Sequence, residues 1–99
     1  MIDREVRVTQ TVLVAVDESK FTPEFMAEFR RHFYDFHTLD DHIEHIAQLV
    51  ARGLVDDFTK FIEGYGPPAE MGIRFHIPRG STETEVLGES PYTISKSES

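Results

Sequence analysis

Histidines with neighbouring carboxylates are the residues of this chain best suited to binding a metal ion. Four of the five histidines fall in one short stretch: His32, His37, His42 and His45. On a helix, His42 and His45 would lie one turn apart and could share a transition metal with a nearby carboxylate. No third or fourth ligand follows at a recognised spacing. A small metal-binding enzyme or sensor using His42 and His45 therefore remains an alternative, and we assign no metal ligand and no cofactor.

Two pairs of adjacent carboxylates are candidates for acid–base chemistry: Asp40 with Asp41, and Asp56 with Asp57. Each pair stands where a helix is expected to begin, and carboxylates there cap the helix and face the positive end of its dipole. Adjacent side chains on a helix also point about 100° apart, so neither pair is placed to share a proton. We expect capping rather than catalysis from both pairs.

The motifs of nucleophilic and phosphate-binding sites are missing from the sequence. The chain has no cysteine, which excludes thiolate catalysis, disulfides and cysteine-based metal sites. It has no G-x-S-x-G motif. Gly64 and Gly66 lead into two prolines rather than into a helix, so they present no cradle of amides to an anion. We expect the protein not to be an enzyme.

An alternating pattern opens the chain. From residue 2 to 16 the even positions are mostly valine, and the odd positions up to Thr11 are polar. This pattern predicts one long strand with one apolar face.

Signals of a helix start follow the strand. Thr22 can cap the helix, Pro23 suits its first position, and Glu24 faces the positive end of the dipole. The large apolar side chains that follow share one stripe, which we expect to anchor the core: Phe25, Met26, Phe29, Phe33 and Phe36.

A second helix start stands at Thr38. Thr38 and Asp41 form a variant of the capping box, and Gly53 suits the left-handed residue that ends a helix. Apolar residues at helical spacing line one face, with His42 at its flank, whereas His45 is expected to point to solvent. The two helices are expected to form a hairpin or a sharply bent pair.

Shorter elements follow the second helix. Residues 56–65 fit either a short helix or a buried irregular segment, with Tyr65 packed against Phe61. The sequence pattern over residues 71–78 predicts a strand, which Pro78 ends. Residues 81–99 are rich in Ser, Thr and Glu and are expected to be a mostly flexible acidic tail, with a short strand at 85–87.

Together these elements predict an α+β fold. A small single domain over residues 1–80 would contain a long N-terminal strand, two or three helices packed on one face and a short C-terminal strand, followed by the tail at 81–99. A short partner cannot cover so long a strand. Its exposed edge is therefore expected either to pair with a second copy, forming a homodimer, or to pair with a strand from the tail.

The charge balance limits the class of partner. Eighteen acidic residues face ten basic ones, for a formal net charge of −8. Phosphates of nucleic acid and anionic membrane surfaces would repel such a chain, so we expect neither as a direct ligand. The sequence shows no apolar run long enough to span a membrane and no signal-peptide pattern, from which we expect a cytoplasmic location.

Carboxylates gather on the outward sides of the two predicted helices. An ordinary solvated surface would have this composition. The alternative is a surface that imitates a nucleic-acid backbone and binds the basic groove of a nucleic-acid-binding protein. On that hypothesis the partner-binding residues are Glu24, Glu28, Asp35, Asp40, Asp41 and Glu44.

In its size, its acidity and its lack of cysteines and catalytic motifs, the chain resembles the small phage-encoded inhibitors of host defence, anti-CRISPR proteins among them. The resemblance covers the whole chain and rests on size and charge, so it assigns no residue a role. It implies a non-enzymatic inhibitor from a phage or mobile element that mimics nucleic acid and blocks a Cas protein. A structural or assembly subunit is a further alternative.

Overall fold

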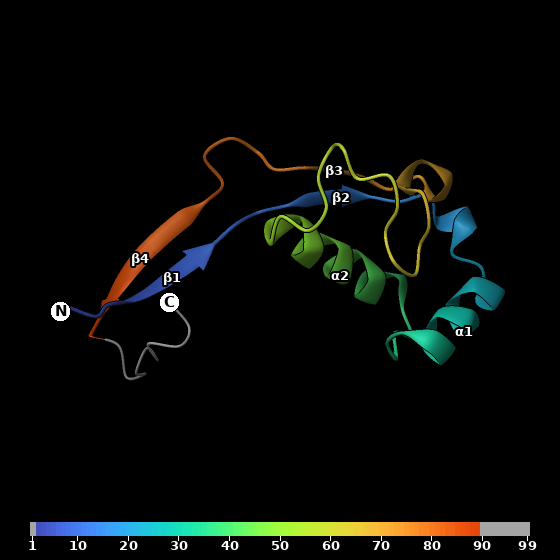
Figure 1. Cartoon of the computed structure of the whole chain (residues 1–99), viewed down its shortest axis with the longest axis horizontal. Helices are drawn as coiled ribbons and strands as arrows, with labels where there is room; N and C mark the ends of the chain where they lie inside the picture. The colour runs from blue at the N-terminus through green and yellow to red at the C-terminus, as the bar shows by residue number, and fades with distance from the viewer. Residues whose placement is uncertain (1, 90–99) are drawn as a thin grey trace. The chain divides into compact units, whose positions relative to one another are not determined.

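The computed structural model describes residues 2–89 and contains two α-helices with antiparallel strands in two small sheets (Figure 1). This arrangement confirms the α+β class. In chain order the elements are β1 (Glu5–Thr9), β2 (Leu13–Ala15), η1 (Glu18–Lys20), α1 (Pro23–His32), α2 (Leu39–Ala51), η2 (Pro68–Met71), β3 (Arg74–His76) and β4 (Glu83–Gly88). Backbone contacts divide the chain into two compact units, one from residues 1–11 with 79–99 and one from residues 12–78.

The N-terminal segment forms two strands rather than the single long strand that its alternation predicts. β1 pairs with β4, and β2 pairs with β3, both antiparallel. Between β3 and β4 the chain contains Pro78, which has no N–H, and Gly80, whose φ is +77°. That stretch cannot continue a ladder of backbone hydrogen bonds. Residues 10–12 consequently lie outside both strands.

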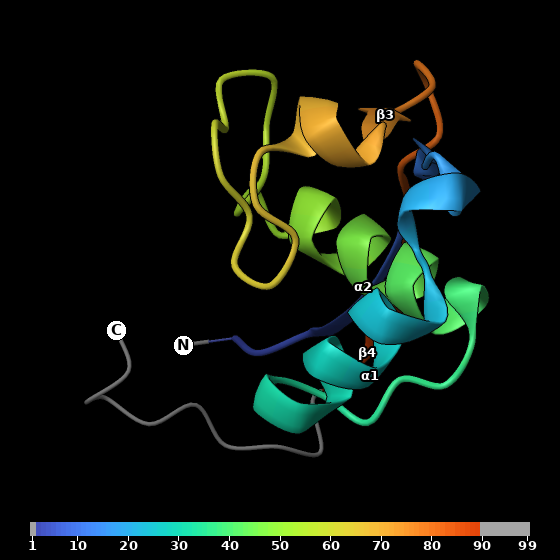
Figure 2. The same ribbon diagram turned by 90° about the vertical axis from the view of Figure 1, so that its right-hand side faces the viewer.

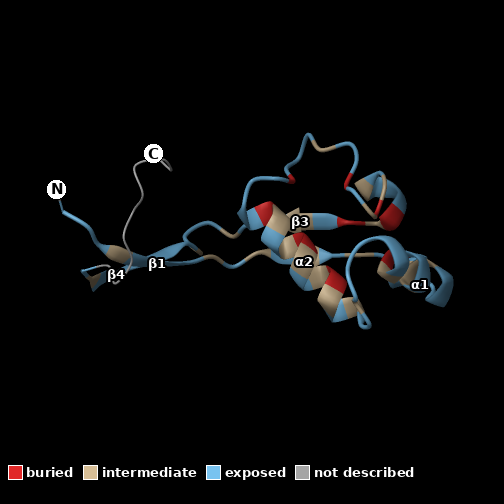
Figure 3. Ribbon diagram, turned by 60° about the horizontal axis from the view of Figure 1, so that its bottom comes forward, coloured by how far each residue is buried: buried red, intermediate tan, exposed pale blue. Residues whose placement is uncertain are grey.

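β1 and β4 make a two-stranded ribbon, in which Val6 lies opposite Val86 and Arg7 lies opposite Glu85. The strand expected at 85–87 is confirmed and is longer, so residues 83–88 of the segment assigned to the tail belong to β4. Residues 90–99 lie outside the described residues. None of the strand residues of the ribbon is buried (Figure 3).

Both predicted helix starts are confirmed. Thr22 Oγ1 accepts a hydrogen bond from the Phe25 N–H, and Thr38 Oγ1 accepts one from the Asp41 N–H in a complete capping box. α1 ends at His32. Thr38 has the extended backbone that the capping box of α2 requires, so the chain between the two helices is not helical. Phe33 and Phe36 therefore lie on the connection between the helices rather than on the helical stripe.

The interior of the second unit lies among α1, α2 and the β2–β3 sheet. α2 packs against β2. Figure 2 shows α1 and α2 with the connection that joins them. Phe29 of α1 meets His42 of α2 with ring centroids 4.6 Å apart. Residues 56–65 form an irregular segment with one bridge between Ile62 and Gly66, not a helix. The buried apolar side chains are Phe29, Ile46, Val50, Val55, Ile62, Tyr65, Met71 and Ile73. Neither helix in the described part of the chain is long and apolar enough to cross a membrane.

Candidate functional site

His42 is the one fully buried polar residue among those described, and aromatic rings surround it. Its Nδ1 lies 2.9 Å from the hydroxyl of Tyr65, which is also buried. Phe29 and Phe36 meet the imidazole edge-on, with centroids 4.6 and 5.1 Å away. The other ring nitrogen, Nε2, is buried and has no hydrogen-bond partner within the described residues. His42 thus lies inside the core, not at the flank of the apolar stripe where the sequence placed it.

Burial keeps this pair neutral. Burial lowers the pKa of His42 and raises the pKa of Tyr65, since each would carry its charge in an apolar surrounding. Within residues 2–89 neither group forms an ion pair with a carboxylate. The pair therefore stabilises the core as a neutral hydrogen bond between α2 and the loop that precedes η2.

The sequence predicted that His45 points to solvent, but in the structure it does not point freely there. Its ring is partly buried and lies 5.0 Å from Tyr34 and 5.4 Å from Phe36, centroid to centroid. Burial, followed by the nearby charge of Arg52, lowers its pKa. Because His42 and His45 are each packed among aromatic rings, they do not form an open pair for a metal ion. Residues 2–89 contain no group of three or more potential ligands that could hold one.

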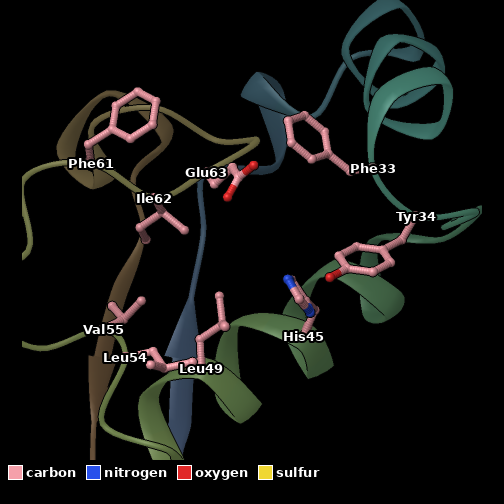
Figure 4. Close-up of a pocket in the computed structure, with 9 residues that line it drawn as sticks. All are labelled: Phe33, Tyr34, His45, Leu49, Leu54, Val55, Phe61, Ile62 and Glu63. Carbon is pink, nitrogen blue, oxygen red and sulfur yellow. The ribbon is translucent and has the colours of Figure 1, made fainter.

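A pocket opens where His45 reaches the surface. Its volume is about 310 Å³, and its walls come from the connection after α1, from α2 and from residues 54–63. Figure 4 shows the carboxylate of Glu63 and the ring of His45 among apolar side chains. The lining residues are Phe33, Tyr34, His45, Leu49, Leu54, Val55, Phe61, Ile62 and Glu63.

The pocket is lined by large apolar side chains that remain exposed. Phe61 and Leu54 are each 66% exposed and Tyr34 is 53% exposed. Glu63 has no ion-pair partner in the described part of the chain. Aromatic groups held at a surface depression are typical anchors of protein interfaces. The site was not predictable from the sequence pattern, which places Phe33 and Phe61 in the core.

A second, wider depression lies between residues 56–60, η2 and β3. It has a volume of about 750 Å³ and carries both signs of charge, from Asp56, Asp57, Lys60 and Arg74. Asp56 is engaged within its own turn, since its Oδ1 accepts hydrogen bonds from the Phe58 N–H and the Thr59 hydroxyl. The Asp56–Asp57 pair is therefore divided between a turn and a mixed-charge surface.

The structure divides the six proposed partner-binding carboxylates into two sets. Glu28 contacts Arg31 at 2.7 Å and His32 at 2.9 Å, and Asp35 contacts His37 at 2.9 Å. Asp41 accepts hydrogen bonds from the N–H groups of His37 and Thr38, which lower the pKa of its carboxyl. These three carboxylates serve local structure.

The other three carboxylates, Glu24, Asp40 and Glu44, are exposed and form no ion pair within residues 2–89. Asp40 and Glu44 stand one turn apart on α2 and so share a side of that helix. The acidic surface free to meet a partner is thus about half the size that the sequence suggested.

Comparison of the chain with models of known protein families, with curated proteins and with solved structures finds no match.

Proposed function

We propose that the protein is a non-enzymatic inhibitor of the anti-CRISPR type, encoded by a phage or mobile element and acting in the host cytoplasm. It binds a basic surface of a nucleic-acid-binding Cas protein and blocks access of the nucleic acid. The observation that supports this proposal most is the exposed aromatic pocket with the unpaired carboxylate of Glu63 (Figure 4).

The pocket suits an arginine or lysine side chain of the partner. Leu54, Phe61 and Tyr34 offer apolar surface to the aliphatic stem, and Glu63 offers a carboxylate to the charged end. The rings also attract a cation placed over their faces. Since burial keeps His45 largely neutral, it adds little positive charge that would repel such a guest.

Glu24, Asp40 and Glu44 support binding over longer range. Exposed, unpaired carboxylates steer a basic partner toward the complex and raise the association rate, an effect that salt screens. The formal net charge of −8 acts in the same direction.

The electrostatic part of the proposal is tested by reversing these three charges. Glu24, Asp40 and Glu44 are changed together to lysine, and inhibition of target binding by purified Cas effector complexes is followed by gel shift. The matched control changes three other exposed acids to lysine, Asp57, Glu70 and Glu89, and so shifts the net charge equally. We expect only the first variant to lose inhibition at about 0.1 M salt. Equal inhibition by the two variants would show that these carboxylates do not bind the partner.

The pocket has its own matched pair of variants. Phe61→Ala removes an exposed ring from the pocket, whereas Phe58→Ala removes an even more exposed ring that does not line it. We expect Phe61→Ala to weaken inhibition about tenfold or more, as loss of an interface anchor does, and Phe58→Ala to leave it unchanged. The same effect from both changes would contradict a role for the pocket.

A further inference from the structure

The β1–β4 ribbon leaves one apolar face exposed. Val6, Val8 and Val86 share that face with Thr84, and all three valines are at least 48% exposed. The opposite face carries an ion pair of 3.7 Å between Arg7 and Glu85. Isolated two-stranded ribbons are marginally stable in water. Pairing with a further strand would therefore stabilise the ribbon.

The second edge of β1 is available for that strand. In the part of the chain that the structure describes, β1 has β4 as its one neighbour, so its other edge pairs with no strand. The unused N–H and C=O groups of an edge strand form a template for an added strand.

Charge along β1 favours a second β1 as the added strand. In an antiparallel pair of identical strands related by a twofold axis at Val6, Glu5 lies opposite Arg7 of the second copy, and Arg7 lies opposite its Glu5. Opposite charges directly across a strand pair stabilise the pair. Moving the axis to Glu5 or to Arg7 would instead place that residue opposite its own copy.

The free edge of β4 is less suited to self-pairing. Its polar face carries Glu83 and Glu85, with Glu89 following. An antiparallel pair of β4 strands centred on Thr84 or Glu85 places carboxylates opposite each other, and one centred on Val86 places Glu83 opposite Glu89. Like charges directly opposite destabilise a strand pair.

We infer that two copies of this chain associate through the free edges of β1, forming a four-stranded antiparallel sheet in the order β4–β1–β1–β4 with the twofold axis at Val6. The axis places Val6 opposite Val6 of the second copy, so the valine faces of the two ribbons become continuous. The contact uses none of the carboxylates or pocket residues assigned to partner binding, so it stands apart from the proposed function.

A charge-exchange experiment tests the inference. One variant carries Arg7→Glu with Glu85→Arg, which keeps the pair within the ribbon but exchanges its charges; the other carries Glu5→Arg. Each variant alone opposes like charges across the axis, whereas a mixture of the two opposes unlike charges. By sedimentation we expect the unchanged chain to show twice the 11.4 kDa of one chain, each variant to show a single chain, and the mixture to show the dimer again.

A cysteine substitution tests the register. The chain has no cysteine of its own, so Val6→Cys introduces a single thiol at the twofold axis. Directly opposed residues have Cα atoms close enough for a disulfide. We expect Val6→Cys to cross-link under mild oxidation, whereas Val8→Cys, which would lie opposite Arg4, should not.

Several results would overturn the inference. A single-chain mass for the unchanged protein at every concentration would leave the β1 edge to another partner or to residues 90–99. Dimers formed equally by both charge variants, or a mixture that stays monomeric, would exclude the pairing of Glu5 with Arg7. Cross-linking at position 8 and not at position 6 would exclude the register.

Discussion

At the scale of single residues, the hydrogen bond between His42 and Tyr65 is the most specific contact in the core. It joins α2 to the loop before η2, and both side chains are buried. A buried polar group that loses its partner lowers stability, whereas replacing both partners by apolar groups of similar shape can be nearly neutral. The two residues should therefore behave as a coupled pair.

Tyr65→Phe tests this coupling. The change leaves both ring nitrogens of His42 without a partner within the described residues, so we expect the free energy of unfolding to fall by about 1–3 kcal/mol. The double change His42→Phe with Tyr65→Phe should recover most of that loss. Urea unfolding of the two single variants and the double variant gives the coupling. Losses that simply add would contradict a coupled pair.

Stability should also depend on pH through the buried histidines. The pKa values of His42 and His45 lie below the usual 6.5 in the folded chain, chiefly because of burial. Below pH 6.5 the unfolded chain therefore binds more protons than the folded one, and acid favours unfolding. We expect full stability above that pH and a progressive loss below it.

Urea unfolding measured between about pH 5 and 8 checks this dependence, with His42→Phe as the comparison. The variant should show a shallower loss of stability on acidification because it lacks one of the two groups. The same slope in both proteins would show that His42 does not contribute.

At the scale of elements, the loop before η2 approaches α1 closely at Gly64. Gly64 has φ +91°, and a Cβ there would lie 2.5 Å from Cε2 of Phe29. Gly66, with φ +79°, has no atom within 4 Å of the corresponding position. The two glycines thus share a left-handed backbone and differ in packing.

Gly64→Ala and Gly66→Ala separate these two effects. Gly66→Ala should lower the free energy of unfolding by about 1–2 kcal/mol, for the left-handed conformation alone. Gly64→Ala should lower it by about 1–3 kcal/mol more, because Phe29 must move. Thermal unfolding of both variants compares them directly. Equal losses would mean that the ring of Phe29 adjusts freely.

The starts of both helices were predictable from local chemistry, whereas the end of α1 at His32 was not. Thr22, Thr38 and Asp41 cap the helices through hydrogen bonds to nearby backbone, and Pro23 occupies the first position of α1, so these signals depend on few residues. The division of the N-terminal strand was not predictable from its alternation, because it depends on Pro78 in a distant partner segment. Pairing between distant segments is set by tertiary structure.

The candidate site was predictable only in part. Capping signals identified Asp41 as structural, and the structure confirms it. Exposure of Phe33 and Phe61 depends on where α1 ends and on the path of an irregular loop. Periodicity places such residues in the core, since large apolar side chains are usually buried.

At the scale of the whole molecule, the acidic charge is divided among several uses. Asp41 and Asp56 serve caps and turns, and Glu28 and Asp35 pair with neighbouring basic side chains. Of the carboxylates assigned to partner binding, Glu24, Asp40 and Glu44 form no ion pair within residues 2–89, and neither does Glu63 in the pocket. Exposed carboxylates combined with apolar anchors would suit the basic partner that we propose, because charge guides the encounter and apolar contact slows dissociation.

The most direct test of the proposed inhibition is the plating efficiency of a phage on hosts whose CRISPR system targets it. Hosts carrying different CRISPR types are compared with and without expression of this protein. We predict that, for at least one type, expression raises plating to the level of a host lacking the matching spacer, and that the Glu24, Asp40 and Glu44 reversal abolishes the rise. Unchanged immunity in every type tested, with the protein present and folded, would contradict the proposal.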